Sequence, residues 1–206
     1  MYAKETAKRT FERLTGIGRP SRREAAASVR QRKAWPSRFV DDGLVPNNAQ
    51  LPFVHYRSAV DVKGVTDPAA VFERLFEDNG WGGSWRNGIY DYLHYHPRTH
   101  EVLGVASGKA RVRFGGKKGK TVILKAGDVV VLPAGTGHQA LSASKDLVVV
   151  GAYPPQGIYE EYEGSLSEHG RAVRMIPRVA MPRRDPVYGA KGPLERLWAR
   201  KRSKGG

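Results

Sequence analysis

The chain of 206 residues contains no cysteine, which excludes disulfides, thiolate metal ligands and cysteine nucleophiles. No apolar run approaches the roughly 20 residues that a membrane-spanning helix needs, and the first residues lack the apolar core of a secretory signal. We therefore expect no membrane partner. A chain without cysteine fits the cytoplasm, and this is the location we expect.

Acidic residues are scarce at both ends of the chain. The formal net charge is +15, and it divides into +8 over residues 1–38, −2 over residues 39–170 and +9 over residues 171–206. The basicity is therefore a property of the two ends. Basic residues are not interleaved with aromatic ones there, so the sequence does not indicate a nucleic-acid partner.

Composition divides the chain into three parts. Residues 1–38 are rich in Arg, Lys, Ala and Ser, which predicts a disordered basic tail, with a transit peptide or a nucleic-acid arm as alternatives. Residues 39–164 are expected to form one domain, with a short helix that starts at Asp67 and Pro68 and stops at Asn79 and Gly80. Residues 165–206 are expected to form an extended arm with a basic tail, because prolines recur there at Pro177, Pro182, Pro186 and Pro193.

The stretch from Gly88 to Gly108 carries the main chemical signal. His94 and His96 stand two residues apart in a run of aromatic and aliphatic residues that predicts a β-strand, so both imidazoles should point to the same face. By the same alternation Tyr90 and Tyr92 should share that face. They are candidate catalytic residues that could hydrogen-bond a substrate or a metal-bound water, unless they only fill the interior.

Two imidazoles and the carboxylate of Glu101 suit a borderline or hard divalent metal. A second apolar strand follows at residues 127–132, and it runs into a Pro/Gly turn with His138 just beyond it. Together the two stretches resemble the two motifs of the cupin family. The first motif, G-x5-H-x-H-x4-E-x6-G, is met at Gly88, His94, His96, Glu101 and Gly108. The second, G-x5-P-x-G-x2-H-x3-N, is met at Gly127, Pro133, Gly135 and His138, with Ser142 in place of Asn.

The resemblance implies a mainly β fold, the cupin double-stranded β-helix, which is a small jelly-roll barrel. It also implies a metal site made of His94, His96, Glu101 and His138. Strand alternation from His96 would instead turn His100 inward, but Pro97 interrupts the strand and the motif spacing favours Glu101. Three imidazoles and a carboxylate favour Mn(II) or Fe(II), with Ni(II) or Zn(II) as alternatives.

Two functions are compatible with this ligand set. The first is a metal-dependent enzyme of the dioxygenase, oxidase or isomerase type that acts on a small oxygenated molecule. The second is a non-catalytic cupin that binds a small ligand and keeps a structural metal. We also expect a homodimer, because the run from Leu147 to Val150 is apolar on both faces and should be covered by a partner.

Overall fold

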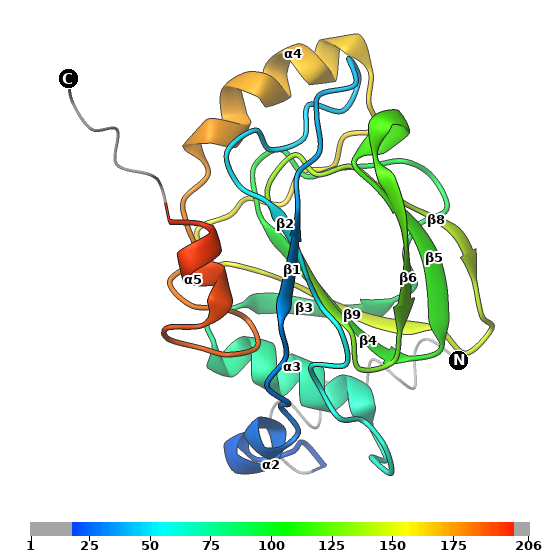
Figure 1. The fold of residues 1–206 in the computed structure, drawn as a ribbon, viewed down its shortest axis with the longest axis vertical. Helices are drawn as coiled ribbons and strands as arrows, with labels where there is room; N and C mark the ends of the chain where they lie inside the picture. Colours follow the sequence, from blue (N-terminus) through cyan, green and yellow to red (C-terminus); the bar gives the residue numbers. More distant parts are fainter. Residues whose placement is uncertain (1–17, 200–206) are drawn as a thin grey trace.

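The computed structural model describes residues 18–199, which form two facing β-sheets with helices outside them (Figure 1). The larger sheet has six strands in the order β1-β2-β7-β4-β9-β3, and the smaller has three in the order β6-β5-β8. The paired strands are antiparallel. The strands are β1 (Ala34–Ser37), β2 (Phe53–Tyr56), β3 (Gly82–Asn87), β4 (Glu101–Ser107), β5 (Lys109–Phe114), β6 (Lys120–Lys125), β7 (Val129–Leu132), β8 (His138–Ala143) and β9 (Val148–Tyr153).

Few of the described residues are helical. The elements are α2 (Arg22–Ala27), α3 (Pro68–Asp78), α4 (Leu166–Met175), α5 (Pro193–Leu197) and the 3₁₀ turns η1 (Gly116–Lys118) and η2 (Ile176–Arg178). The expected mainly β fold is therefore confirmed. No helix within residues 18–199 is long and apolar enough to cross a membrane.

The barrel is not closed. Within the described residues the two sheets are separate ladders, and the loop between β3 and β4 makes an isolated bridge to the smaller sheet, from His94 to His138. Between the sheets lies an apolar core to which β2, β4, β5, β6, β7 and β9 each contribute buried side chains. The end of this interior near His138 is where the candidate site forms.

Helix α3 covers the outer face of the larger sheet. The Asp67 carboxylate caps it by accepting from the Ala70 N–H, and Pro68 occupies the first turn, as the sequence predicts. The helix packs on β4 and β9, where Gly104 leaves room for the Phe72 ring; a side chain at that position would collide with the ring. The central strands are thus buried on both faces, which explains their unbroken apolar runs.

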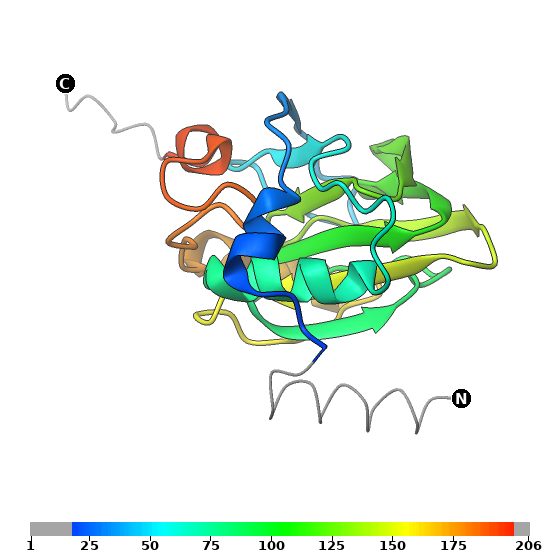
Figure 2. The same ribbon diagram turned by 90° about the horizontal axis from the view of Figure 1, so that it is seen from below.

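The segment before residue 39 is not entirely a tail. Ser21 and Glu24 form a capping box at the start of α2, and Ala25 is buried against the core. Arg19 and Arg22 pair with acidic residues at the end of α3, with N···O distances of 2.8 and 3.0 Å. Figure 2 shows α2 (blue) crossing over α3. The expected boundary at residue 39 is therefore wrong for residues 18–38, and residues 1–17 lie outside the described part.

A shortened chain tests this correction. A protein that begins at residue 39 lacks α2 and also β1, which pairs with β2 over four residues. Compared with a protein that begins at residue 18, we expect it to lose about 2 kcal/mol of stability or more, which lowers Tm by roughly 4–8 °C in a domain of this size. Calorimetry of the two proteins measures the difference. Equal Tm values would mean that residues 18–38 contribute nothing to the fold.

The C-terminal arm is also more ordered than its prolines suggest. Ser165 and Glu168 form a second capping box, and α4 follows before the first proline, Pro177, is reached. Trp198 is buried after α5, where its indole N–H donates to the Pro52 carbonyl at 2.8 Å. The expectation of an extended arm is therefore wrong for residues 166–178 and 193–198, and residues 200–206 lie outside the described part.

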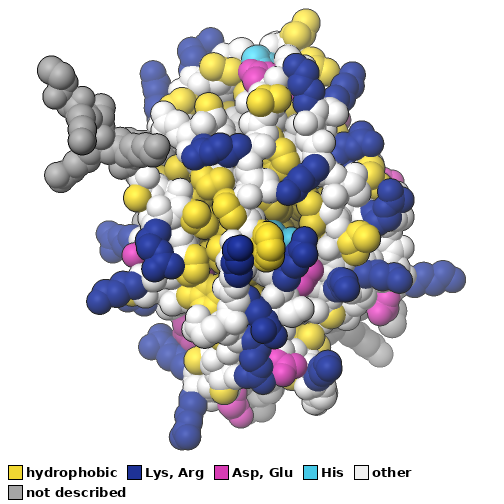
Figure 3. All heavy atoms as spheres, viewed as in Figure 1, with side chains coloured by type: hydrophobic (Ala, Val, Ile, Leu, Met, Phe, Trp, Pro, Cys, Tyr) yellow, Lys and Arg dark blue, Asp and Glu magenta, His cyan; other side chains and the backbone are white. Residues whose placement is uncertain are grey.

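The apolar run from Leu147 to Val150, for which a partner subunit was expected, is covered within the same chain. The run from Leu147 to Val150 enters β9, a strand flanked by β4 and β3 and covered by α3 of the same chain. At the sheet edge, β1 contains Pro36, which cannot donate to a further strand, and the cations of Lys33 and Arg57 lie 4.6 and 5.3 Å from the Trp35 ring centroid. Figure 3 shows Lys and Arg spread over this side of the molecule. The homodimer stays a prediction, to be tested by light scattering.

Candidate metal centre

His94 and His96 lie in an extended loop between β3 and β4. The predicted strand over residues 89–96 does not form; within it, pairing is limited to two isolated bridges, from His94 to His138 and from Tyr95 to Tyr162. The His94 N–H donates to the His138 carbonyl at 3.1 Å, and the His138 N–H returns a bond of 2.9 Å. Because the backbone is still extended at these positions, both imidazoles face the interior as the alternation predicts.

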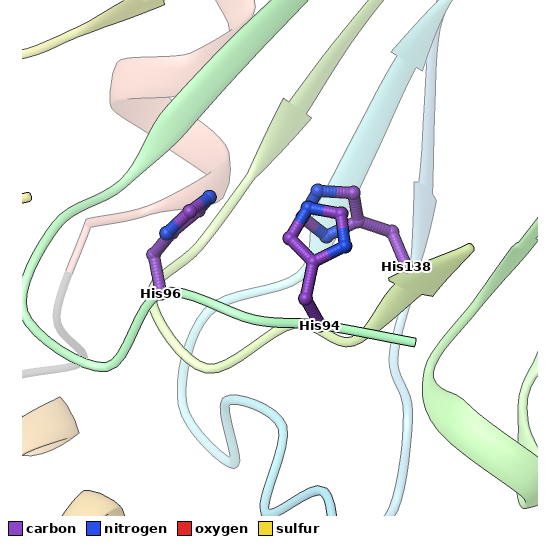
Figure 4. A group of neighbouring side chains, drawn as sticks. All are labelled: His94, His96 and His138. Carbon is purple, nitrogen blue, oxygen red and sulfur yellow. The ribbon is translucent and has the colours of Figure 1, made fainter. Parts of the chain in front are cut away.

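The three imidazoles converge (Figure 4). One nitrogen from each of His94, His96 and His138 lies within 4.8 Å of the others, and all three residues are buried. The Glu101 carboxylate, at the first position of β4, completes the group. Its Oε2 atom lies 3.4 Å from His138 Nε2 and 3.7 Å from His96 Nε2. The structure therefore brings together the four residues that the motifs predict.

Backbone carbonyls orient each imidazole. The Nδ1 atoms of His94, His96 and His138 lie 3.3, 2.9 and 3.1 Å from the carbonyls of Tyr92, Glu160 and Thr136. A carbonyl can only accept, so each Nδ1 carries the proton and each Nε2 keeps its lone pair. This arrangement fixes the tautomer that metal-binding histidines use.

The electrostatics of the group match a cation-binding site. Burial lowers the pKa of all three histidines, so the neutral ligand form prevails at neutral pH. Burial raises the pKa of Glu101 to about 7, and its Oε2 atom is buried without a hydrogen-bond partner. A divalent ion would satisfy both the unpaired oxygen and the three free lone pairs. The three imidazoles could therefore hold a metal, and the residues present fit one.

The group opens into a cavity of about 460 Å³, a size typical of small-molecule sites. Its walls come from β3, β4, the start of β8, the end of β9, the loop that carries His94, and the segment after β9. Besides the four residues above, they include Trp85, Ile89, Tyr90, Leu103, Tyr153, Tyr159 and Glu161. The walls are thus mainly aromatic and aliphatic, with the polar groups gathered near the histidines.

Tyr153 on β9 lies beside Glu101. The Trp85 indole N–H donates to the Tyr153 hydroxyl at 2.8 Å, and this hydroxyl lowers the pKa of the neighbouring Glu101 carboxylate. Gly151 makes the arrangement possible, because any side chain at that position would collide with the Trp85 ring. Burial beside Glu101 raises the pKa of Tyr153, which keeps its hydroxyl protonated and able to donate.

The two tyrosines expected in the cavity behave differently. Tyr90 lines it, whereas Tyr92 does not; the two rings stack with centroids 4.9 Å apart. The Tyr92 hydroxyl donates to Glu161 at 2.9 Å from outside the cavity. The shared face that alternation predicts is confirmed, because the Tyr90 and Tyr92 rings lie 5.2 and 5.4 Å from the His94 ring, but only Tyr90 lines the cavity.

The sequence did not indicate Tyr153, Tyr159 and Glu161 as residues of the cavity. The rings of Tyr153 and Tyr159 lie 5.9 and 5.1 Å from that of His96, although both residues are more than 50 positions away in sequence. Neither belongs to a spaced motif. They come next to Glu101 because β9 pairs with β4, a contact that no sequence motif indicates.

His100 immediately precedes β4 and does not line the cavity. Its Nδ1 accepts from the Ala134 N–H at 2.9 Å, and its ring lies 4.7 Å from that of Trp198. Burial lowers its pKa to about 3, so it is neutral. His55 is buried elsewhere, 3.3 Å from Asp128. The geometry thus favours Glu101 over His100 as the fourth member of the group.

The fold and the site together define a class of protein: a β domain with a buried histidine triad at one end of its interior. Comparison with known protein families agrees with this class, because residues 86–151 match the cupin domain family. The chain is 40% identical over 162 residues to the uncharacterized protein YjlB of Bacillus subtilis (strain 168), covering 79% of this chain and 94% of that protein. The chain belongs to the cupin family.

Solved structures similar to this chain are more distant. One is the WlaRB TDP-quinovose 3,4-ketoisomerase of Campylobacter jejuni, with a TM-score of 0.36 and 15% identity over 43% of this chain and 73% of that one. Another is an uncharacterized conserved protein with a double-stranded β-helix domain from Klebsiella pneumoniae, with a TM-score of 0.33 and 18% identity over 68% and 94%. These similarities concern the fold alone.

Proposed function

We propose that this protein is a metal-dependent enzyme that acts on a small oxygenated organic molecule, by chemistry of the dioxygenase, oxidase or isomerase type. One observation carries the proposal. The three histidines and Glu101 line a cavity large enough for a small molecule, and that cavity also contains phenol groups. A purely structural metal would need the four ligands but not the cavity beside them.

His94, His96, His138 and Glu101 would hold the metal, with Mn(II) or Fe(II) preferred and Ni(II) or Zn(II) as alternatives. When bound, the ion supplies Lewis-acid polarisation of a substrate oxygen at an open position. The chain's own residues do the rest. Trp85 and Leu103 supply apolar wall to the cavity, and the Tyr153 hydroxyl lies beside Glu101.

Tyr159 is the residue best placed to hold a proton for a substrate. It lines the cavity beside His96, and its hydroxyl donates to Glu161 Oε2 at 3.0 Å. The bond to Glu161 and partial burial raise the pKa of Tyr159, with burial the larger cause, so the proton stays on its oxygen until a stronger base accepts it. Of the two candidates from the sequence, Tyr90 then forms part of the cavity wall, and Tyr92 supports Glu161 from outside the cavity.

The test begins with protein loaded with Mn(II) or Fe(II) and a panel of small hydroxy acids, diketones and enediols, followed by oxygen uptake and by product analysis for isomers. Turnover that disappears in His96→Ala supports the proposal. Binding without turnover of any compound favours the non-catalytic alternative instead.

Tyr159→Phe refines the same test. We expect turnover to fall about 10²-fold or more, as for loss of a proton-transfer group, with metal content unchanged. Tyr92→Phe is the matched control, since it also removes one phenol bond to Glu161 but from outside the cavity. Equal turnover in the two variants would contradict a proton-holding role for Tyr159.

A further inference from the structure

The cavity has no free positive charge. Among the described residues that line it, Arg86 alone is a lysine or arginine. Its guanidinium pairs with two carboxylates that do not line the cavity. Nε and one terminal nitrogen donate to the two oxygens of Glu73 at 3.0 and 2.8 Å, and the other terminal nitrogen donates to Asp67 at 3.0 and 3.1 Å. Two carboxylates thus neutralise it, and no lining residue offers a cation to an anionic substrate group.

The cavity does have a fixed negative charge besides Glu101. Glu161 lines the wall, and its two oxygens accept the hydroxyls of Tyr92 and Tyr159 at 2.9 and 3.0 Å. Two donors on the two oxygens are the arrangement of a carboxylate. The phenols orient this charge without cancelling it. The backbone near Glu161 is held as well, because the Glu160 carbonyl accepts from His96 and Tyr162 pairs with Tyr95.

Aromatic rings complete the surroundings of Glu161. Tyr90, Tyr153 and Tyr159 come from three different segments and line the same cavity with Trp85. Ring faces are electron-rich and favour flat molecules and cations over anions. The negative charge of Glu161 and the aromatic walls therefore both favour flat ligands that are neutral or cationic over anionic ones.

We infer that Glu161 selects substrates by charge: the cavity takes a small planar metal chelator whose far end is neutral or cationic, and rejects one whose far end carries a carboxylate or phosphate. This inference rests on the proposed function, because the metal holds the chelating oxygens while Glu161 acts on the rest of the molecule. The expected effect is about tenfold in affinity, the size of one charge interaction in a partly solvated site.

Three probes share the same chelating catechol group and differ in the charge at the far end. They are catechol, dopamine and 3,4-dihydroxybenzoate, whose far ends are neutral, cationic and anionic. Calorimetric titrations into Mn(II)-loaded protein without oxygen should give the tightest binding for dopamine and the weakest for 3,4-dihydroxybenzoate. In Glu161→Gln we expect the ratio of these two dissociation constants to shrink by about tenfold or more, with catechol affinity and metal content little changed.

Two further variants control the experiment. Glu163→Gln removes an exposed carboxylate from the same segment that does not line the cavity, and it should leave the ratio as it was. Glu161→Asp keeps the charge and should keep the order of the probes, which guards against a folding defect in Glu161→Gln. An unchanged ratio in Glu161→Gln overturns charge selection.

The proposed function fails on a different measurement. If Mn(II) does not raise the affinity for catechol above that of the metal-free protein, the metal does not hold the ligand, whatever the ratio of the charged probes. If none of the three probes binds the loaded protein, both proposals are overturned.

Discussion

Replacing His138 with Ala is expected to lower metal binding sharply. Its Nε2 atom faces Glu101 Oε2 at 3.4 Å, and its ring lies 4.0 Å from that of His94, so it stands at the centre of the candidate ligand group. Loss of one of three imidazoles should weaken Mn(II) binding by more than the ~10–100-fold typical of a residue that only supports a ligand. Metal analysis after purification and Mn(II) titration measure this directly.

Thermal unfolding gives an independent readout. A metal that binds only the folded protein stabilises it by about 2.7 kcal/mol when present at 100 times its dissociation constant. The parent protein should therefore unfold at a higher temperature with Mn(II) than without, and His138→Ala should not. Equal Mn(II) content in His138→Ala and the parent would remove this residue from the metal site.

Two other histidines serve as controls. His169 is partly exposed on α4 and lies 2.8 Å from Asp41, so His169→Ala should change neither metal content nor the Mn(II)-dependent rise in Tm. His55 is buried beside Asp128, and His55→Ala should lower stability by about 1–3 kcal/mol while leaving the metal in place. His169→Ala thus controls for the loss of any histidine, and His55→Ala controls for a loss of stability. Only the loss of a metal ligand should lower the metal content.

The ligand group could be predicted from sequence because its members sit at fixed offsets. His94 and His96 share a face through strand-like alternation even though the strand itself does not form, and the turn at Pro133 to Gly137 delivers His138 opposite them. Local backbone geometry thus sets these positions. Spacing along the chain is then enough to predict proximity in space.

The cavity wall could not be predicted in this way. Tyr153, Tyr159 and Glu161 reach the site only because β9 pairs with β4, a contact between segments about 50 residues apart. The sequence also did not predict that α2 is an ordered helix. This helix is only six residues long, so it depends on tertiary contacts such as the burial of Ala25 against the core, which composition cannot reveal.

Glu101 and His100 are expected to respond in opposite ways to the same substitution by Gln. The two are neighbours in sequence, but Glu101 points toward His96 and His138 whereas His100 packs against Trp198. Glu101→Gln removes the negative charge and a strong oxygen donor. We expect Mn(II) affinity to fall by more than tenfold, which also removes the preference for Mn(II) or Fe(II) that a carboxylate brings.

The stability of the metal-free protein should instead fall more in His100→Gln than in Glu101→Gln. Glu101 Oε2 is buried without a partner, so Gln at this position costs the metal-free protein little and could even stabilise it. His100→Gln loses the contact with Trp198 and disturbs the bond from the Ala134 N–H, which should cost about 1–3 kcal/mol. Its Mn(II) affinity should change by no more than about tenfold, since the ring lies outside the group.

Measuring both quantities in both variants makes the test sharp. Mn(II) titration and calorimetry of the metal-free protein give four numbers, and the expected pattern is a loss of affinity in one variant and of stability in the other. A larger loss of Mn(II) affinity in His100→Gln than in Glu101→Gln would exchange their roles. Four imidazoles would then make a softer site suited to Cu(II), Ni(II) or Zn(II), and the preference for Mn(II) or Fe(II) would have to be abandoned.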